Sequence, residues 1–342
     1  MKQAFEKGRH LVPEGYHPVL NHMQTQEAIA VLKTVFAREL CVALNLTRVS
    51  APLFVAGDSG LNDDLSGIER KVTFDPLEQP GVRLEVVQSL AKWKRMALHR
   101  YGAHAGRGIY TDMDAIRRDE ITDNLHSIYV DQWDWELVIE REQRTPEFLK
   151  DTVRRIHNAV RAAERAMVGA FPELTMGIAE EVVFVTSQEL EDAYPDMTPT
   201  QRELAFTREH RVVFVMQIGW PLTSGKSHDM RAPDYDDWLL NGDLLYYSPV
   251  LDCAMEMSSM GIRVDPAAMD QQLRAAGRDE RRSLPFHKAL LAGQLPLTIG
   301  GGIGQSRLSM LLLGKAHIGE VHCAVWPPEV IEAFAQGGIM LL

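Results

Sequence analysis

Apolar side chains recur along this chain with two periods, one helical and one alternating, and these periods predict its secondary structure. Helical spacing marks residues 25–45, with Thr25 as the expected N-cap, and a longer amphipathic helix at residues 146–170. Shorter helices are expected at residues 90–102 and 285–293. Apolar runs predict strands at residues 46–56 (stopped near Pro52), 83–89, 107–113, 126–135, 180–187 and 210–220.

The order of these elements predicts the fold class. Strands often follow one another directly, and residues 242–265 are typical of a two-stranded hairpin, so strand and helix do not alternate strictly. We therefore expect an α+β fold with a mixed or antiparallel sheet flanked by helices. Neither a repeat nor a low-complexity linker interrupts the sequence, so we treat residues 1–342 as one domain.

Composition and charge narrow the class of protein. The 342 residues are 45% hydrophobic and 24% charged, which is ordinary for a globular protein, and no apolar run suits a membrane span. The net charge of −11, from 36 basic and 47 acidic residues, disfavours nucleic acid and anionic membranes as partners. The three cysteines are scattered and the N-terminus lacks a signal-peptide core, so we expect a cytoplasmic protein with reduced thiols.

A glycine-rich stretch, TIGGGIGQSRLSML at residues 298–311, has the look of a phosphate-binding loop. Its spacing, Gly300-x-Gly302-x-Gly304-x-x-Arg307, fits neither the dinucleotide fingerprint nor the Walker A loop, which needs a lysine. We interpret the stretch as bare backbone that opens a buried helix, with Arg307 as a fixed cation near the helix start. The alternative is close packing of a helix on a sheet, where glycine only removes bulk.

Polar residues on apolar strands are the next candidates for chemistry. Alternation along HSIYVDQWDWE places Gln132 and Asp134 on one face of a strand and two tryptophans on the other. Asp243 and Glu256 fall on the two arms of the predicted hairpin, where a buried carboxylate needs a partner. Facing carboxylates suit Mg²⁺, which completes its shell with phosphate oxygens and water. The alternative is ordinary ion pairing, with Arg263 as the obvious partner.

Two acidic segments and several histidines allow more than one interpretation. Residues 59–67 form a Gly/Asp/Asn-rich loop in which Asp63 and Asp64 are either catalytic or turn-capping. Residues 231–238, RAPDYDDW, are turn-like, and a solvated loop is their simplest interpretation outside any wider context. The histidines without ligand partners at metal spacing are expected to be structural: His99, His126, His228 and His322.

Together these groups suit attack on the α-phosphate of a bent ATP. Two arginines, Arg307 and one from the run Arg117-Arg118-Asp119-Glu120, would neutralise the phosphates together with Mg²⁺, and a carboxylate would mark the adenine amino group. The cations are needed because a carboxylate that attacks a phosphate meets charge repulsion.

These residues lie in motifs that resemble the ammonia-dependent asparagine synthetases of type A, the aspartate–ammonia ligases. That family is similar to the catalytic core of class II aspartyl- and asparaginyl-tRNA synthetases. The resemblance covers essentially the whole chain and implies a homodimer with an antiparallel sheet flanked by helices. In it, the helix at 25–45 and the strand to Pro52 would form the dimer element. The stretches that carry it are LNDDLSG, SLAKWKRMAL, AIRRDE, LHSIYVDQWDWE, TSQEL, RAPDYDDW, LNGD, EMSSMGIRVD and TIGGGIGQSRLSMLLL.

The resemblance also implies roles for individual residues. Arg117 matches a residue at the α-phosphate of ATP or AMP, Glu120 one at the adenine, and Arg307 one at the far phosphates. Asp243 and Glu256 match carboxylates that carry Mg²⁺. Ser259 matches a residue beside those carboxylates, and Gly302 and Gly304 match residues beneath the nucleotide. The positions around aspartate are matched by Ser89, Lys94, Asp134, Asp236 and Arg263. Asp63 and Gln132 match positions where ammonia arrives.

The implied reaction has two steps. The side-chain carboxylate of L-aspartate attacks the α-phosphate of ATP, which gives β-aspartyl-AMP and pyrophosphate. Ammonia then attacks the acyl carbon, which gives asparagine and AMP. Of the matched residues we expect Asp63, Arg117, Gln132 and Arg307 to be catalytic, and Asp63 is our candidate for capturing ammonium and accepting its proton.

This sequence departs from some members of that family at two places. Asp64 stands where some members have asparagine, and its charge bears on the pKa of Asp63. Only Leu239 separates YDDW from LNGD, where some members have a longer loop, and this bears on how the site closes.

Two other functions compete with this one. A trimmed aspartyl- or asparaginyl-tRNA synthetase would need an anticodon-binding barrel of roughly 100 residues, and catalytic motifs that begin near residue 59 leave no room for it. A non-catalytic sensor of asparagine or AMP would have no need of the phosphate clamp. Glutamine-dependent synthesis is disfavoured because there is no N-terminal cysteine nucleophile.

Overall fold

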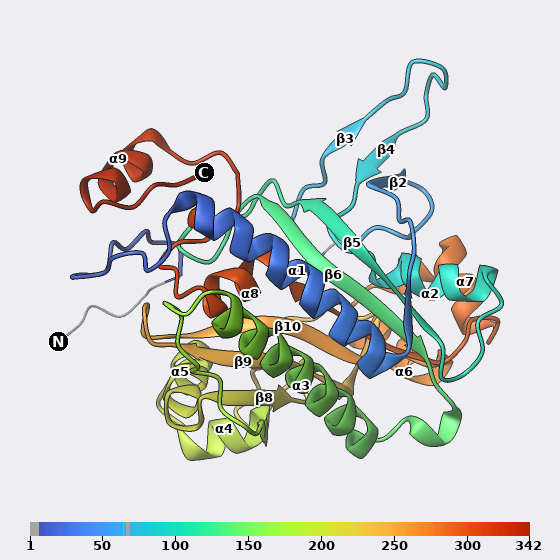
Figure 1. Ribbon diagram of the computed structural model, residues 1–342. Coiled ribbons are helices and arrows are strands. Elements are labelled where there is room, and N and C mark those ends of the chain that lie inside the picture. The colour runs from blue at the N-terminus through green and yellow to red at the C-terminus, as the bar shows by residue number, and fades with distance from the viewer. Residues whose placement is uncertain (1–6, 64, 66–68) are drawn as a thin grey trace.

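A computed structural model describes residues 7–63, 65 and 69–342, and Figure 1 shows its helices packed around a large twisted sheet. The strands are β1 (Leu46–Arg48), β2 (Phe54–Ala56), β3 (Thr73–Phe74), β4 (Leu84–Val86), β5 (Gly108–Ile116), β6 (Tyr129–Val138), β7 (Val183–Thr186), β8 (Val212–Met216), β9 (Asp236–Ser248), β10 (Cys253–Arg263) and β11 (Thr298–Gly304). The helices are α1 (His22–Leu44), α2 (Ala91–Arg100), α3 (Pro146–Ala170), α4 (Ser187–Ala193), α5 (Pro199–His210), α6 (Pro266–Ala275), α7 (Pro285–Leu291), α8 (Gln305–Leu312) and α9 (Pro328–Gln336). Short 3-10 helices are η1 (Arg141–Gln143), η2 (Asp279–Ser283) and η3 (Ile318–Glu320).

The large sheet has eight strands in the order β1-β5-β6-β11-β10-β9-β8-β7. Its two outermost pairs are parallel and all pairs between them are antiparallel. A second sheet, in the order β2-β4-β3, stands apart in Figure 1 as a projecting arm. The predicted α+β class with a mainly antiparallel sheet is therefore confirmed.

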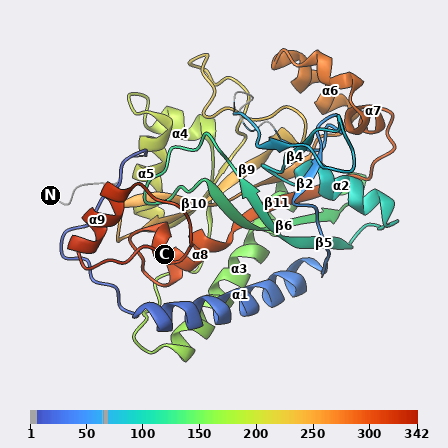
Figure 2. The same ribbon diagram turned by 90° about the horizontal axis from the view of Figure 1, so that it is seen from above.

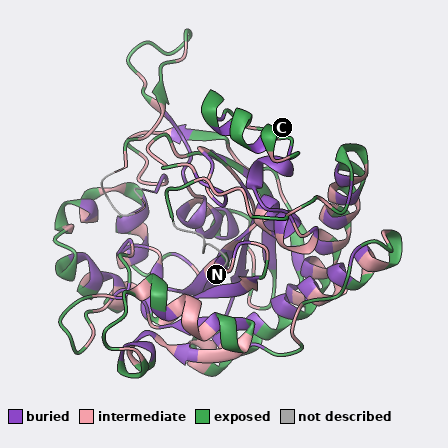
Figure 3. Ribbon diagram, turned by 90° about the vertical axis from the view of Figure 1, so that its left-hand side faces the viewer, coloured by how far each residue is buried: buried purple, intermediate pink, exposed green. Residues whose placement is uncertain are grey.

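One face of the large sheet is covered by α1 and α3, which lie side by side in Figures 1 and 2. Phe36 of α1 packs on Trp133 of β6 with ring centroids 4.5 Å apart. In Figure 3, which is coloured by burial, the strands are largely buried and the surrounding helices expose their outer sides. The opposite face is covered in part by α2 and in part by α4 and α5.

The two long helices form where the sequence predicts them, because their signals are local. At α3, Thr145 accepts a hydrogen bond from the amide of Phe148 and Pro146 occupies the first turn, so the boundaries match the prediction. At α1, the cap is Asn21 and not Thr25, whose hydroxyl instead donates to the carbonyl of Asn21 at 2.7 Å. The expected strand at 46–56 is split into β1 and β2.

The glycine stretch forms a strand and not a loop, while the buried helix expected directly after it is confirmed as α8. Thr298–Gly304 is β11, paired with β6 on one side and β10 on the other, and its glycines lie outside the positive-φ region. A Cβ on Gly300 would stand 2.6 Å from Cδ of Glu136, and one on Gly302 would stand 2.9 Å from Cδ of Gln132. The glycines therefore make room for side chains that cross the strand, which is closer to our alternative of close packing.

The predicted hairpin at 242–265 is confirmed, but its first arm begins earlier, at Asp236. Only Leu239 separates the two motifs here, and β9 continues through it without a loop. This continuity places Asp236 and Asp243 on one strand beside β10. Among the described residues, no helix is both long and apolar enough to cross a bilayer.

Candidate active site

A cavity of about 440 Å³ opens on the face of the sheet that α1 and α3 leave free. Apart from Asp243, all of the residues predicted for the site line it. They are Asp63, Ser89, Lys94, Arg117, Glu120, Gln132, Asp134, Asp236, Glu256, Ser259, Arg263, Gly302, Gly304 and Arg307. Residues far apart in the sequence thus meet at one place, although their individual roles stay predictions.

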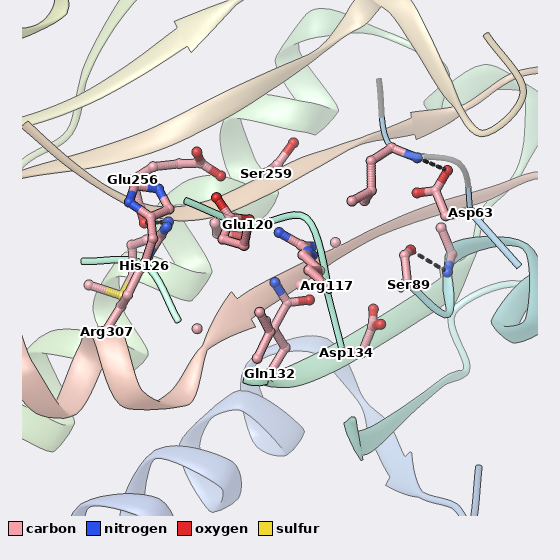
Figure 4. Close-up of a pocket in the computed structure, with 18 of the residues that line it drawn as sticks. Asp63, Ser89, Arg117, Glu120, His126, Gln132, Asp134, Glu256, Ser259 and Arg307 are labelled. Atoms are coloured by element: carbon pink, nitrogen blue, oxygen red, sulfur yellow. Dashed lines mark hydrogen bonds between the residues drawn. The ribbon is translucent and has the colours of Figure 1, made fainter. Parts of the chain in front are cut away.

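The cavity has two ends of different character, as Figure 4 shows. Glu256 and Arg307 lie at one end, and Asp63 and Asp134 lie at the other. Arg117 lies between them, which suits a substrate that reacts in the middle of the cavity.

Strand β6 supplies the floor of the cavity. Gln132 and Asp134 line it, while Trp133 and Trp135 are buried in the core on the helix side, as the alternation predicted. The hydroxyl of Ser89 accepts a hydrogen bond from the amide of Ala91 at 3.1 Å, at the start of α2 (Figure 4). This contact fixes the rim next to the floor.

The end of the cavity near Asp134 is built from buried ion pairs. Arg263 donates from Nε to Oε1 of Glu136 at 3.0 Å and from Nη2 to Oε2 at 2.8 Å, and it also contacts Asp236. Lys94 contacts Asp134 and donates to the carbonyl oxygen of Gly301 at 3.1 Å. Fixed charges of both signs in a small pocket are what an amino acid with a charged side chain requires.

Burial and neighbouring charges together determine the pKa values of the side chains near Asp134. Burial lowers the pKa of Lys94 well below its ordinary value, against the opposing charge of Glu136. Burial also raises the pKa of Asp236, although Arg263 opposes the shift. For Glu136 burial works in the same upward direction, but Arg263 outweighs it, so the pKa lies below its ordinary value. Glu136 and Arg263 therefore form the charged anchor of the pocket.

The other end carries the groups expected for phosphates. Arg307 on α8 donates to the carbonyl of Glu256 at 2.8 Å and to that of Leu125 at 3.4 Å, so its guanidinium is held at the rim. The side chain of Glu256 is exposed to the cavity, which corrects the prediction that it is buried on its strand. A cation and a carboxylate thus both remain accessible to a ligand.

Asp243 is paired, but not with the residue that the sequence suggested. Arg263 is occupied by Glu136 and Asp236, and the partner of Asp243 is Arg231. Burial raises the pKa of Asp243 to about 8, which Arg231 opposes and the nearby charge of Glu256 reinforces. Sequence reasoning assigned Arg231 no role, although it opens the motif RAPDYDDW, because its contact with Asp243 depends on how that segment folds back on β9.

The two carboxylates fit Mg²⁺ bound together with a nucleotide. Oδ1 of Asp243 is buried, and no donor in the described part of the chain reaches it. No cluster of three or more potential ligands exists among the described residues, so the protein would supply few ligands itself. Mg²⁺ accepts that situation, because it commonly takes one or two carboxylates and completes its shell with phosphate oxygens and water.

Asp63 is buried at the opposite end, with an exposed fraction of 1%. Its Oδ1 accepts a hydrogen bond from the amide of Leu65 at 3.2 Å, so Asp63 caps its own turn and lines the cavity as well. Asn62 fixes the backbone beneath it by accepting from the amides of Asp63 and Gln88, both at 2.9 Å. Asp64 lies outside the described residues.

Two other residues of the cavity were missed or misjudged. Tyr235 lines it, and burial together with the charge of Asp63 raises the pKa of its phenol well above the ordinary value. His126, expected to be structural, also lines it, and its Nδ1 lies 2.8 Å from Oδ1 of Asp123. The segment RAPDYDDW is largely buried and not a solvated loop, because it packs under α6 and α7.

Solved structures that are similar to this chain have the fold of class II aminoacyl-tRNA synthetases. The asparaginyl-tRNA synthetase of Pyrococcus horikoshii complexed with asparaginyl-adenylate matches with a TM-score of 0.64 at 14% identity, over 89% of this chain and 70% of that one. That of Entamoeba histolytica, also with asparaginyl-adenylate, matches with a TM-score of 0.62 at 15% identity, over 88% and 66%. At such low identity the likeness shows the fold alone, and it confirms the predicted class II architecture.

Sequence comparison is more specific. An aspartate–ammonia ligase of Clostridium perfringens is 55% identical over 97% of this chain and 98% of its own length. That of Ruminiclostridium cellulolyticum is 55% identical over 96% of this chain and 98% of its own length. That of Lactobacillus johnsonii is 53% identical over 97% of this chain and 99% of its own length. The family model described as aspartate-ammonia ligase matches residues 23–338. With near-full-length identity of this kind, the chain belongs to the aspartate–ammonia ligase family.

Proposed function

We propose that this protein makes L-asparagine from L-aspartate, ammonia and ATP through β-aspartyl-AMP, and releases AMP and pyrophosphate. The observation that supports this most directly is the two-ended cavity, with a cationic rim at Arg307 and a pocket of paired charges at Arg263. A carboxylate held at one end and a triphosphate held at the other would meet near Arg117.

In the first step, the protein would bring two anions together. We propose that Arg117 neutralises the α-phosphate while Arg307 holds the leaving pyrophosphate, which lowers the repulsion met by the attacking carboxylate. Glu120 would accept from the adenine amino group, and Gly302 and Gly304 would lie beneath the nucleotide. Arg263 and Lys94, with Asp134, Asp236 and Ser89, would orient aspartate so that its side chain points toward Arg117.

In the second step, Asp63 and Gln132 would receive ammonia. A buried carboxylate can bind ammonium as its counterion and accept the proton that must leave before nitrogen attacks the acyl carbon. Gln132 would orient the acyl group from the floor of the cavity. The attack forms a C–N bond and breaks the bond between the acyl carbon and a phosphate oxygen of AMP, which leaves with the electron pair. The nitrogen loses its second proton to solvent as the amide forms.

We propose Mg²⁺ as the metal of this site, with Asp243 and Glu256 as its protein ligands and Ser259 beside them. The ion, when bound, supplies positive charge to the phosphate oxygens. Arg231 contacts Oδ2 of Asp243 in the structure, so Oδ1, which no donor in the described part of the chain reaches, is the oxygen that would bind the ion.

The decisive experiment is product analysis with ATP, Mg²⁺, aspartate and ammonium. Asparagine and AMP in equal amounts are expected. ADP in place of AMP would refute the adenylate mechanism, and transfer of aspartate to tRNA would favour a synthetase.

We further propose a homodimer through α1 and β1 and a cytoplasmic location. Exposed apolar side chains on α1 support the dimer: Met23 and Val42 are 69% and 78% exposed. Analytical ultracentrifugation of the Val42→Asp variant beside the wild type tests it, since a dimer contact there should not tolerate a charge. Cell fractionation tests the location.

A further inference from the structure

A buried carboxylate with no part in the proposed reaction, Asp234, lies where several segments of the chain meet. Its Oδ2 accepts from Nη1 of Arg281 at 2.9 Å and from Nζ of Lys92 at 3.3 Å. Nε2 of His287 on α7 lies 2.9 Å from the same oxygen. Asp234 and His287 are both 0% exposed, so this is a built interior junction and not a surface ion pair.

The junction is ionised on the carboxylate side. Burial would raise the pKa of Asp234, but Lys92, His287 and Arg281 outweigh it, so its pKa is far below the ordinary value. An ionised carboxylate only accepts hydrogen bonds, so Nε2 of His287 is the donor in their contact. Nε2 of His287 therefore carries a proton, and Nδ1 is directed away from Asp234, on the side of Gly60.

Through Asp234, the junction holds in place the segment that carries the cavity residues Tyr235 and Asp236. Asp234 directly precedes Tyr235 and Asp236, both of which line the cavity. Gln272 of α6 donates from Nε2 to the carbonyl of Asp236 at 2.9 Å and to that of Pro233 at 3.1 Å. Because α6 and α7 hold this segment by its backbone and by Asp234, its position depends on them.

On the other side, the same helices contact the loop that leads to Asp63. Gly60 packs against the start of α7: a Cβ there would stand 2.9 Å from Cβ of Leu284 and 3.6 Å from Nδ1 of His287. Gly60 has φ +70°, which favours glycine. Leu61 packs on an apolar cluster that α6 and α7 form with their neighbours, so the loop is seated on these helices over more than one residue.

We propose that His287 and Asp234 are positioning residues that fix the distance between the aspartate-binding segment at Tyr235–Asp236 and the ammonia-side loop at Asp63. The proposal rests on the proposed function. His287 contacts Asp234 with one ring nitrogen and faces Gly60 with the other side of its ring, so it spans the gap between the two halves of the amino-acid end. Neither residue lines the cavity among the described residues, so neither acts on substrate directly.

The consequence falls mainly on the second step. Adenylation needs the aspartate carboxylate and the phosphates in line. Of the groups proposed for this step, Asp236 belongs to the held segment, but Arg263 and Gln272 still fix it when His287 is removed. Attack by ammonia needs the Asp63 loop at the correct distance from the acyl carbon held near Tyr235 and Asp236. A displacement of about 1 Å between reacting groups can cost roughly a hundredfold in rate.

The experiment separates the two steps in the full-length protein. We would measure aspartate-dependent exchange of pyrophosphate into ATP, which reports adenylation, and asparagine formation with its KM for ammonium. For His287→Ala we expect exchange within about threefold of the wild type, and asparagine formation reduced about tenfold to a hundredfold with a raised KM for ammonium. His287→Gln should recover part of this loss, because its amide can still donate to Asp234.

Two further variants keep the test sharp. Gly60→Ala disturbs the same contact from the loop side and should give the same selective loss. His157→Ala is the matched control, because His157 is also buried and bonded, to Tyr246 at 2.9 Å, but does not line the cavity or touch this junction. It should lower the melting temperature and leave the ratio of the two steps unchanged.

The possible outcomes either support the proposal or overturn it. Equal loss of both steps in His287→Ala, or the same selective loss in His157→Ala, overturns the proposal. If His287→Ala does not fold, the Gln and Gly60 variants decide alone, and an unchanged ratio of the two steps in both overturns it. A wild type that forms no AMP contradicts the proposed function instead, so the two failures are distinguishable.

Discussion

Replacing Gly300 with alanine should destabilise the protein and weaken its binding of aspartate. Gly300 lies in the central strand β11, and a Cβ there would stand 2.6 Å from Nη2 of Arg263 and from Cδ of Glu136. Both side chains are fully enclosed, with exposed fractions of 2% and 0%, so neither can move aside into solvent. The added methyl group must push apart a pair of charges that anchors the amino-acid end of the cavity.

The magnitude follows from two costs. Overpacking a core position by one methyl group costs about 1–3 kcal/mol. Breaking a buried ion pair by displacing one partner costs about 3–5 kcal/mol. The two costs arise from the same displacement, so they are not added. We expect the free energy of unfolding of Gly300→Ala to be about 3–5 kcal/mol lower than that of the wild type, as measured by urea denaturation. The KM for aspartate in pyrophosphate exchange should rise by roughly tenfold or more, since about 1.4 kcal/mol lost in the pocket is a factor of ten.

Gly169→Ala is the control for this experiment. Gly169 lies in the last turn of α3, and a Cβ added to it would meet open space, so alanine should stabilise the helix by up to about 1 kcal/mol. If Gly300→Ala changes the unfolding free energy by less than about 1 kcal/mol and leaves the KM for aspartate unaltered, the assignment of Glu136 and Arg263 as the anchor is wrong.

Three other predictions test the remaining parts of the structure. Asp63→Asn should retain aspartate-dependent pyrophosphate exchange and lose asparagine formation; survival of both activities would remove Asp63 from the reaction. Arg307→Gln should weaken the binding of pyrophosphate about tenfold to a hundredfold, because it removes one charge-assisted hydrogen bond worth about 1.5–3 kcal/mol. The binding of AMP should not weaken. Titration calorimetry measures both affinities, and equal weakening of the two would contradict this role of Arg307. Burial lowers the pKa of His317 from 6.5 to about 3. Between pH 6.5 and about 3, the unfolded chain binds a proton at His317 that the folded protein does not bind. The free energy of unfolding is therefore largest above pH 6.5 and decreases as the pH falls toward 3, by at most about 1.4 kcal/mol per pH unit. Melting curves of His317→Phe between about pH 4 and 7 should show a flatter dependence than those of the wild type, and an identical slope would contradict this.

Local signals account for the parts of the fold that could be predicted. The cap at Thr145, the proline that follows and the spacing of apolar residues determine α3 without reference to the rest of the chain. The alternation along β6 likewise placed Gln132 and Asp134 on the cavity side, because a strand has only two faces.

Pairing between distant segments accounts for what could not be predicted. The pairs Glu136 with Arg263 and Arg231 with Asp243 join residues whose proximity depends on strand order and register, which no local pattern encodes. The glycines of β11 suggested a turn because glycine permits one. Their actual cause is the volume of Glu136 and Gln132, which are on the neighbouring strand and become relevant only after the sheet has formed.

The place of β11 in the sheet also constrains the order in which the protein can be built during translation. It lies between β6 and β10, yet it follows both of them in the chain, so the ribosome completes it last among the described strands. Until then the sheet exists as two halves, β1-β5-β6 and β10-β9-β8-β7, each with an unpaired edge strand. Such edges are templates for pairing with other chains, and closing the sheet across a long sequence separation is slow. The nascent protein should therefore be most vulnerable to aggregation just before residues 298–304 leave the ribosome, and most dependent on chaperones at that moment.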